Sequence, residues 1–195
     1  MKCGLNKWFN ISSVEATHII VSVATISLAF SLFKNDNLFS FEYFILILLS
    51  VGSAFILHEL GHKYAALHFG VHAEYRAWTT GLFLAVAMAF LTRGSFVFAA
   101  PGAVYIFGRV TNEQNGKIAL AGPAMNFLLA LFFLALYFGG AASEFAALGA
   151  YINLLLGGFN MIPIHPFDGA KIAAWNQGVW VAGFAAFFLG FLLLF

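Results

Sequence analysis

The sequence predicts an all-α polytopic membrane protein with about five transmembrane helices and one re-entrant or hairpin-like segment. The first observation is composition: 62% of the 195 residues are hydrophobic and only 9% are charged, whereas soluble domains are about half apolar and about a quarter charged. A soluble fold of this length could not bury so much apolar surface. The second observation is that the apolar residues form long uncharged runs. No repeat or soluble accessory module separates these runs, so residues 1–195 are expected to form a single domain.

Five runs are expected to cross the bilayer as helices. Each approaches the roughly 20 residues that a helix needs to cross the hydrocarbon core, and the first and last runs are on the short side. The polar residues 34–37 indicate a short loop between the first two helices. In chain order, the predicted spans are residues 17–33, 41–67, 118–140, 146–163 and 179–195.

The stretch 77–107 is expected to behave differently. Residues 77–92 are uncharged but few for a span, and residues 96–107 contain the turn signal Pro101-Gly102 among Val, Phe and Tyr, which favour extended chain. We expect a partly extended, re-entrant or hairpin-like excursion. Such backbone is tolerated at membrane depth where it is buried against protein or lines a cavity. The alternative is a pair of ordinary spans.

Basic residues predict the orientation. If the stretch 77–107 returns to the side it came from, the basic residues that flank the first three spans share one side, which the positive-inside rule makes cytoplasmic. The C-terminus then lies outside. The net charge of +1 and the lack of a basic run give no sign of a nucleic-acid partner. The basic residues concerned are Lys2, Lys7, Lys63, Arg76, Arg109 and Lys117.

The second predicted helix carries an H-E-x-x-H motif, formed by residues 58–62. His58 and His62 are four residues apart, so on a helix their imidazoles face one point. Glu59 lies beside them, where it can take a proton from water at the metal. This spacing is typical of zinc metalloproteases, whose catalytic zinc has three protein ligands and one open position. Ionisable groups at membrane depth are costly unless they pair or bind an ion.

Asp168 is the candidate for the third ligand. It follows the fourth predicted span, which ends on the same side as His58. Pro163 and Pro166 lack amide donors and cannot continue a helix, so the chain is expected to break there and to place Asp168 on irregular backbone at shallow depth. The other acidic residues after the motif lie in polar surroundings or in a loop predicted on the opposite side. A solvated loop aspartate is the alternative reading.

Two asparagines are candidates for binding the substrate or the oxyanion. Asn160 begins the broken segment that carries Asp168, where it can donate to an oxyanion or cap the end of the helix. Asn126 lies early in the third predicted span. It is expected to hydrogen-bond towards the active-site region or to make a plain contact between helices.

These motifs resemble those of the site-2 proteases, a family of intramembrane zinc metalloproteases. The resemblance spans residues 17–171 and rests on three segments: the H-E-x-x-H motif, the Asn-x-x-Pro-x-x-Pro-x-Asp-Gly pattern of residues 160–169, and Ala-Gly-Pro-Ala-Met-Asn at residues 121–126. The chain lacks the accessory modules that many members carry, so it resembles a minimal catalytic core.

The resemblance implies a function and a location. It implies that His58, His62 and Asp168 bind one zinc ion and that Glu59 is catalytic. The implied substrates are membrane-anchored proteins, cut within or near their transmembrane segments to release regulatory domains. The protein is then expected in the cell membrane as a multi-pass protein, in contact with the lipid bilayer, and the basic residues place its active site toward the cytoplasmic side.

Other functions fit the same residues. A non-proteolytic membrane protein of the same fold would bind metal without cleaving a substrate. A transporter with an intramembrane metal site would also explain polar groups at membrane depth and a broken helix, and it predicts ion flux with no requirement for Glu59. For a protease, a helical substrate must first unwind. An exposed strand edge within residues 96–105 is expected to bind the unwound segment by strand addition.

Overall fold

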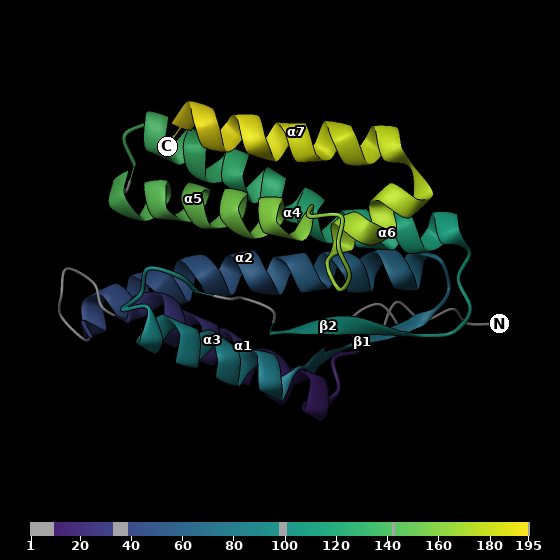
Figure 1. Cartoon of the computed structure of the whole chain (residues 1–195), viewed down its shortest axis with the longest axis horizontal. Coiled ribbons are helices and arrows are strands. Elements are labelled where there is room, and N and C mark those ends of the chain that lie inside the picture. Colours follow the sequence, from purple (N-terminus) through teal and green to yellow (C-terminus); the bar gives the residue numbers. More distant parts are fainter. Residues whose placement is uncertain (1–9, 33–38, 98–100, 142, 195) are drawn as a thin grey trace.

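The computed structural model describes residues 10–32, 39–97, 101–141 and 143–194 (Figure 1). Within these residues the chain forms seven helices and two strands. Lys2, Cys3, Lys7 and Lys34 lie outside the described residues. The elements are α1 (Ser13–Ser31), α2 (Phe41–His68), β1 (His72–Ala77), α3 (Thr79–Leu91), β2 (Gly102–Phe107), α4 (Asn112–Phe138), α5 (Ser143–Asn160), α6 (Asp168–Trp175) and α7 (Gln177–Leu194).

The predicted spans correspond to helices α1, α2, α4, α5 and α7. Four of these, α1, α2, α4 and α7, are long and apolar enough to cross a membrane, and α3 is a shorter apolar helix. The protein is therefore mostly helical, with several candidate membrane spans. Many large apolar side chains on α7 are exposed, including Phe184, Phe188 and Leu192, as expected for a helix whose solvent is lipid.

The prediction of an all-α fold is wrong in one respect, because β1 and β2 form a two-stranded antiparallel sheet. Extended chain was expected near β2 but not at β1. In β1, Ala73 and Tyr75 are buried while the residues beside them are more exposed. This alternation is the pattern of a half-buried strand. The strand is short and carries charged residues, so no long apolar run marks it.

The sheet joins the two ends of the excursion. His72 pairs with Phe107 and Ala77 pairs with Gly102, so the chain that leaves the sheet through α3 comes back to it through β2 (Figure 1). The alternative of two ordinary spans fails on length. The 13 residues of α3 extend about 20 Å at 1.5 Å per residue, short of the ~30 Å hydrocarbon core.

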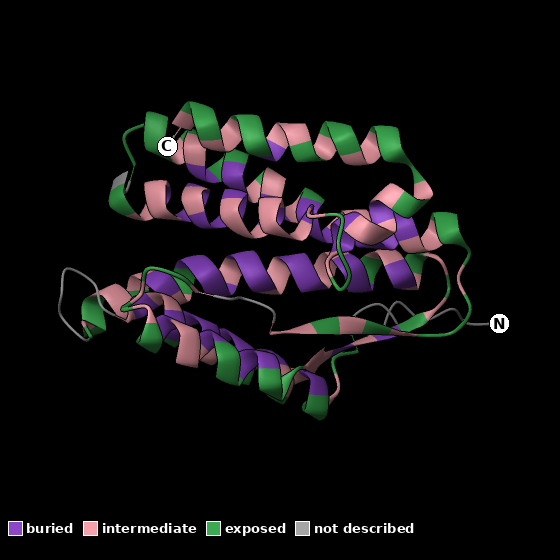
Figure 2. Cartoon of the chain, viewed as in Figure 1, coloured by how far each residue is buried: buried purple, intermediate pink, exposed green. Residues whose placement is uncertain are grey.

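Helix α2 lies at the centre of the molecule. It packs against α1 on one side and against α4 and α5 on the other, while α7 packs on α5 and α6. Figure 2 shows buried residues along much of α2 and an exposed outer surface on α7. One apolar cluster joins α1, α2, β1 and α5 through Ile26, Phe55, Tyr75 and Ile152. The central position of α2 places its H-E-x-x-H motif inside the protein.

Candidate metal centre

The three predicted ligands converge in the structure. His58 and His62 lie on adjacent turns of α2, and Asp168 is the first residue of α6. The two Nε2 atoms are 3.0 Å apart. Asp168 Oδ2 is 3.3 Å from the Nε2 of His58 and 3.0 Å from that of His62. All three side chains are buried, and their ligand atoms form a group that can hold one metal ion.

This donor set fits zinc. Zinc–nitrogen bonds of about 2.0–2.1 Å in a tetrahedron place neighbouring ligand atoms about 3.3 Å apart, close to the observed separations. The other ring nitrogen of each histidine faces an acceptor: His62 Nδ1 donates to the Ile118 carbonyl at 2.8 Å, and His58 Nδ1 donates to Asn126 Oδ1 at 2.6 Å. Each Nε2 is therefore left with a lone pair directed at the shared point.

Space for the imidazoles depends on a glycine in α4. A Cβ atom at Gly122 would overlap Nε2 of both His58 and His62. A second glycine shapes the Asp168 side of the site, since a Cβ atom at Gly169 would overlap the Met161 carbonyl. Both glycines belong to the sequence segments that carried the family resemblance, and their role here is to permit close packing around the ligands.

Asp168 is held in place as a carboxylate. The chain breaks after α5, as predicted, but Asp168 is the first residue of helix α6 and does not lie on the irregular backbone that was expected. Lys171, one turn further along α6, places its Nζ 3.3 Å from Asp168 Oδ1, which leaves Oδ2 to face the imidazoles. Burial alone would raise the pKa of the Asp168 carboxyl, but His62 and His58 hold that pKa well below its usual range. The third ligand is therefore ionised.

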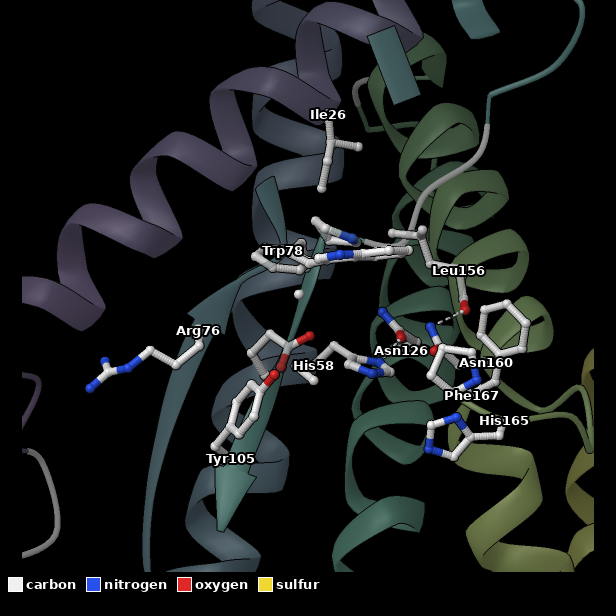
Figure 3. A pocket seen from close by; sticks show the side chains of 16 residues that line it. Ile26, His58, Arg76, Trp78, Tyr105, Asn126, Leu156, Asn160, His165 and Phe167 are labelled. Carbon is white, nitrogen blue, oxygen red and sulfur yellow. Dashed lines mark hydrogen bonds between the residues drawn. The ribbon is translucent and has the colours of Figure 1, made fainter. Parts of the chain in front are cut away.

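Glu59 lies at a cavity beside the metal ligands. The cavity has a volume of about 410 Å³, and its walls come from α1, α2, the sheet, α4, α5 and the loop before α6. Figure 3 shows Ile26 and Trp78 at one end of it, His165 at the other, and His58 between them. Glu59 is buried, and its Oε2 has no hydrogen-bond partner within the part of the chain that the structure describes. One carboxylate oxygen is thus free to act.

The two asparagines have different surroundings. Asn160 ends α5 and donates from Nδ2 to the Leu156 carbonyl at 2.9 Å. It lines the cavity with His58 (Figure 3) and also with Glu59. Asn126 lines the same cavity but is fully buried, and its Nδ2 donates to the Ala54 carbonyl and to Asn153. Both amide hydrogens of Asn126 are therefore engaged, while Asn160 still has one amide hydrogen beyond the Leu156 bond.

The sheet presents one closed edge and one open edge. The backbone amide of Trp78 donates a hydrogen bond to the Pro101 carbonyl. In an antiparallel pair, hydrogen-bonded and non-hydrogen-bonded residue pairs alternate, so the amides of Gly102, Val104 and Ile106 point away from β1. Among the described residues, no backbone carbonyl accepts a hydrogen bond from any of these three amides. All three residues line a smaller cavity that also contains Glu59 and Asp168. The open edge of β2 therefore borders the metal centre.

The outer edge of β1 is covered by α1. The Tyr75 amide donates to Glu15 Oε1 at 3.0 Å, and the Ala77 amide donates to His18 Nδ1 at 3.3 Å. Neither His18 nor Glu15 was predicted to lie at the site. No sequence pattern links residues that are 59 and 60 positions apart. The only available signal was an acidic residue beside an otherwise apolar run.

Comparison with known proteins agrees with this site. The model of "Peptidase family M50" matches residues 43–142. "Putative zinc metalloprotease MJ0611" of Methanocaldococcus jannaschii is 44% identical over 88% of this chain and 90% of its own length. "Zinc metalloprotease MJ0392" of the same organism is 29% identical over 82% of this chain and 40% of its own length. "Putative zinc metalloprotease Rip2" of Mycolicibacterium smegmatis is 28% identical over 77% and 66%, respectively. No solved structure matches.

Proposed function

The chain belongs to peptidase family M50, and from that premise we propose how its own residues hydrolyse a peptide bond. It is an intramembrane zinc metalloprotease whose zinc site consists of His58, His62 and Asp168. The observation that carries the proposal is the convergence of these three ligand atoms beside Glu59, whose buried carboxylate oxygen is unpaired among the described residues.

We assign acid and base roles to Glu59. When bound, zinc supplies Lewis acidity that polarises a carbonyl and makes water a nucleophile near neutral pH. Glu59 accepts a proton from the attacking water as the water oxygen bonds to the carbonyl carbon. Glu59 then gives that proton to the amide nitrogen as the C–N bond breaks. The products are a carboxylic acid and an amine, so the atoms of one water molecule are all accounted for.

Asn160 and Asn126 receive separate assignments. Asn160 lines the cavity next to Glu59, and we assign its remaining amide hydrogen to the developing oxyanion. The two amide hydrogens of Asn126 already have acceptors, so we assign it to orienting His58 rather than to contact with the substrate.

We propose that the substrate binds as an extended strand along β2. A transmembrane helix hides its carbonyls in its own hydrogen bonds, so it must unwind before a protease can reach them. The backbone amides of Gly102, Val104 and Ile106, which have no backbone acceptor among the described residues, offer hydrogen bonds to such a strand. They border the cavity that holds Glu59, whereas α1 covers the other edge of the sheet.

The substrates we propose are membrane-anchored proteins that are cut within or near a transmembrane segment. We further propose that residues 1–195 act as a single catalytic core and that the metal centre faces the cytoplasmic side. In this arrangement α3 enters the membrane region and the chain comes back on the same side. The paired ends of the excursion support this topology, as do the basic residues Arg76 in β1 and Arg109 shortly after β2.

Cleavage of a reporter transmembrane substrate tests this function. Purified protein in detergent is compared with Glu59→Gln, and the products are identified by mass. Wild type is expected to cut inside the apolar segment, and Glu59→Gln is expected to retain at most about one hundredth of the rate. Glu113→Gln removes an exposed carboxylate and serves as the matched control. Equal cleavage by wild type and Glu59→Gln would show that Glu59 is not the acid/base, and zinc-dependent ion flux without cleavage would favour a transporter.

A further inference from the structure

We propose that Asn153 is a positioning residue for the metal ligand His58 and acts through Asn126. Asn153 lies on α5 and is fully buried. Its Nδ2 donates to the Gly149 carbonyl at 2.8 Å, and its Oδ1 accepts from Asn126 Nδ2 at 3.0 Å. Asn126 Oδ1 in turn accepts from His58 Nδ1. Hydrogen bonds therefore run without a break from the metal centre through α4 into α5. This inference rests on the zinc site of the proposed function.

We call the hydrogen bonds from Asn153 through Asn126 to His58 the relay. Two backbone carbonyls determine which atom donates and which accepts in each of these bonds. A carbonyl oxygen can only accept, so the Gly149 carbonyl requires the amide nitrogen of Asn153 and turns its oxygen toward Asn126. The Ala54 carbonyl lies 3.1 Å from Asn126 Nδ2 and likewise requires the amide nitrogen of Asn126 on its side. Both constraints leave Asn126 with its oxygen facing His58, which must then carry its proton on Nδ1.

His58 needs such a relay and His62 does not. The partner of His62 Nδ1 is the Ile118 backbone carbonyl, which can only accept a hydrogen bond. The partner of His58 Nδ1 is a side-chain amide, which can present either an acceptor or a donor. If the Asn126 amide were turned over, its NH2 group would face His58 and favour the tautomer with the proton on Nε2. In that tautomer Nε2 carries a hydrogen and has no lone pair for the metal.

The setting of Asn153 supports a role beyond packing. It lies on a helix whose neighbouring residues Ile152 and Leu154 are buried apolar side chains, and burying an amide there is unfavourable unless its hydrogen bonds are made. The Gly149 carbonyl can also accept the ordinary helical hydrogen bond from the backbone amide of residue 153, so it does not depend on the Asn153 side chain. The feature that only Asn153 supplies is an acceptor for the second amide hydrogen of Asn126.

Two substitutions at Asn153 separate positioning from packing. Asn153→Leu removes the acceptor, whereas Asn153→Asp keeps an acceptor oxygen in the same place. Both lose the hydrogen bond to the Gly149 carbonyl, and both are expected to lower the melting temperature of the zinc-free protein. Ile152→Ala on the same helix is the control, because it lowers the melting temperature without touching the relay. Should Asn153→Leu not accumulate, Asn153→Ala takes its place with the same expectation.

The measurement is the dissociation constant for zinc in the purified protein, obtained by competition with a chelator. We expect Asn153→Leu to bind zinc about tenfold more weakly, at the lower end of the effect of losing a ligand's direct partner. Asn153→Asp and Ile152→Ala are expected to stay within about threefold of wild type. Unchanged zinc affinity in Asn153→Leu, or an equal loss in Asn153→Asp, would overturn the relay. Lack of zinc binding by wild type would instead overturn the proposed function.

Discussion

Glu15 Oε1 accepts a hydrogen bond from the backbone amide of Tyr75 at 3.0 Å, so a carboxylate of α1 closes the outer edge of β1. The second oxygen of the same carboxylate lies 2.5 Å from Lys63 Nζ. Lys63 directly follows the metal ligand His62 on α2. One buried side chain therefore fixes the sheet that borders the cavity to the helix that carries two metal ligands.

The buried pair of Glu15 and Lys63 predicts a large loss of stability when only one partner is removed. Both side chains are at least 95% buried, so Glu15→Gln leaves a buried ammonium without its counter-charge and is expected to cost about 3–5 kcal/mol. Adding Lys63→Met to Glu15→Gln is expected to recover much of that loss. Thermal unfolding in detergent measures both changes.

The exposed pair of Glu113 and Lys117 on α4 supplies the comparison. Glu113→Gln breaks this pair, in which both side chains are well exposed, and the expected cost is below about 1 kcal/mol. If Glu15→Gln unfolds at the same temperature as Glu113→Gln, the buried pair does not hold the sheet to α2 in the way that we infer.

The open edge of β2 predicts a strong effect of proline. The Val104 amide points away from β1, and Val104→Pro removes this donor from the edge where the substrate is expected to pair. Cleavage is expected to fall at least about tenfold in kcat/KM, with zinc retention unchanged. Val104→Ala keeps the amide and is expected to cleave at close to the wild-type rate. Proline at Val97 and Ala99 extends the test along the approach to β2, and Ala99 lies outside the described residues.

Full cleavage by the Val104→Pro protein would rule out strand addition at this edge. A loss of both cleavage and zinc would point instead to damage at the metal centre, because β2 also lines the cavity that holds Asp168. Measurement of zinc in the same samples separates these two results.

The helices and the metal ligands could be predicted from the sequence more completely than the side-chain contacts between helices that position the ligands. Apolar runs located α1, α2, α4, α5 and α7, and four of these helices, α1, α2, α4 and α7, are long and apolar enough to cross a membrane. The start of α4 was placed at residue 118, yet the helix begins at Asn112, where Thr111 and Gln114 form a capping box. That signal is readable from sequence, but it lies in a polar segment that a search for apolar runs excludes.

Long-range contacts had no such signal. The motif spacing indicated that His58 and His62 share a face, and the broken span indicated Asp168. Nothing in the sequence pairs Asn153 with Asn126, or Glu15 with Lys63, because such contacts depend on how helices pack rather than on local pattern. A polar residue within an apolar helix is a general sign of an interhelical hydrogen bond, and Asn153 fits that description.

Asp168→Asn is expected to weaken zinc retention. The substitution keeps the size of the side chain but replaces a negatively charged ligand with a neutral amide, so zinc affinity is expected to fall by at least about a hundredfold, since loss of a mere outer-shell partner already costs 10–100-fold. Metal analysis after dialysis against a chelator measures the effect, with Glu113→Gln as a control that changes an exposed carboxylate. Full zinc occupancy in Asp168→Asn would mean that the third ligand lies elsewhere.

Gly122→Ala is expected to remove zinc without unfolding the protein. The added methyl group would overlap the Nε2 atoms of His58 and His62, so the imidazoles must move apart or turn away from the shared point. Gly190→Ala on α7 is the matched control, because its methyl group would meet only the end of the Leu154 side chain at 3.2 Å. Zinc content and melting temperature are measured on the same samples. Wild-type zinc content in Gly122→Ala would show that the site does not depend on the close approach of Gly122 to the two imidazoles.

The proposed orientation can be tested with Cys3, the one cysteine of the chain, which lies outside the described residues. If the N-terminus is cytoplasmic, a membrane-impermeant maleimide applied to intact cells should leave Cys3 unlabelled, while a permeant maleimide should label it. In a Cys3→Ser background, a cysteine appended after Phe195 should react with the impermeant reagent, because the five proposed crossings place residues 3 and 195 on opposite sides. Labelling of Cys3 from outside would invert the orientation and place the metal centre toward the outer face. Reaction at both ends would instead mean an even number of crossings, and the excursion through α3 would then have to change sides despite the pairing of His72 with Phe107.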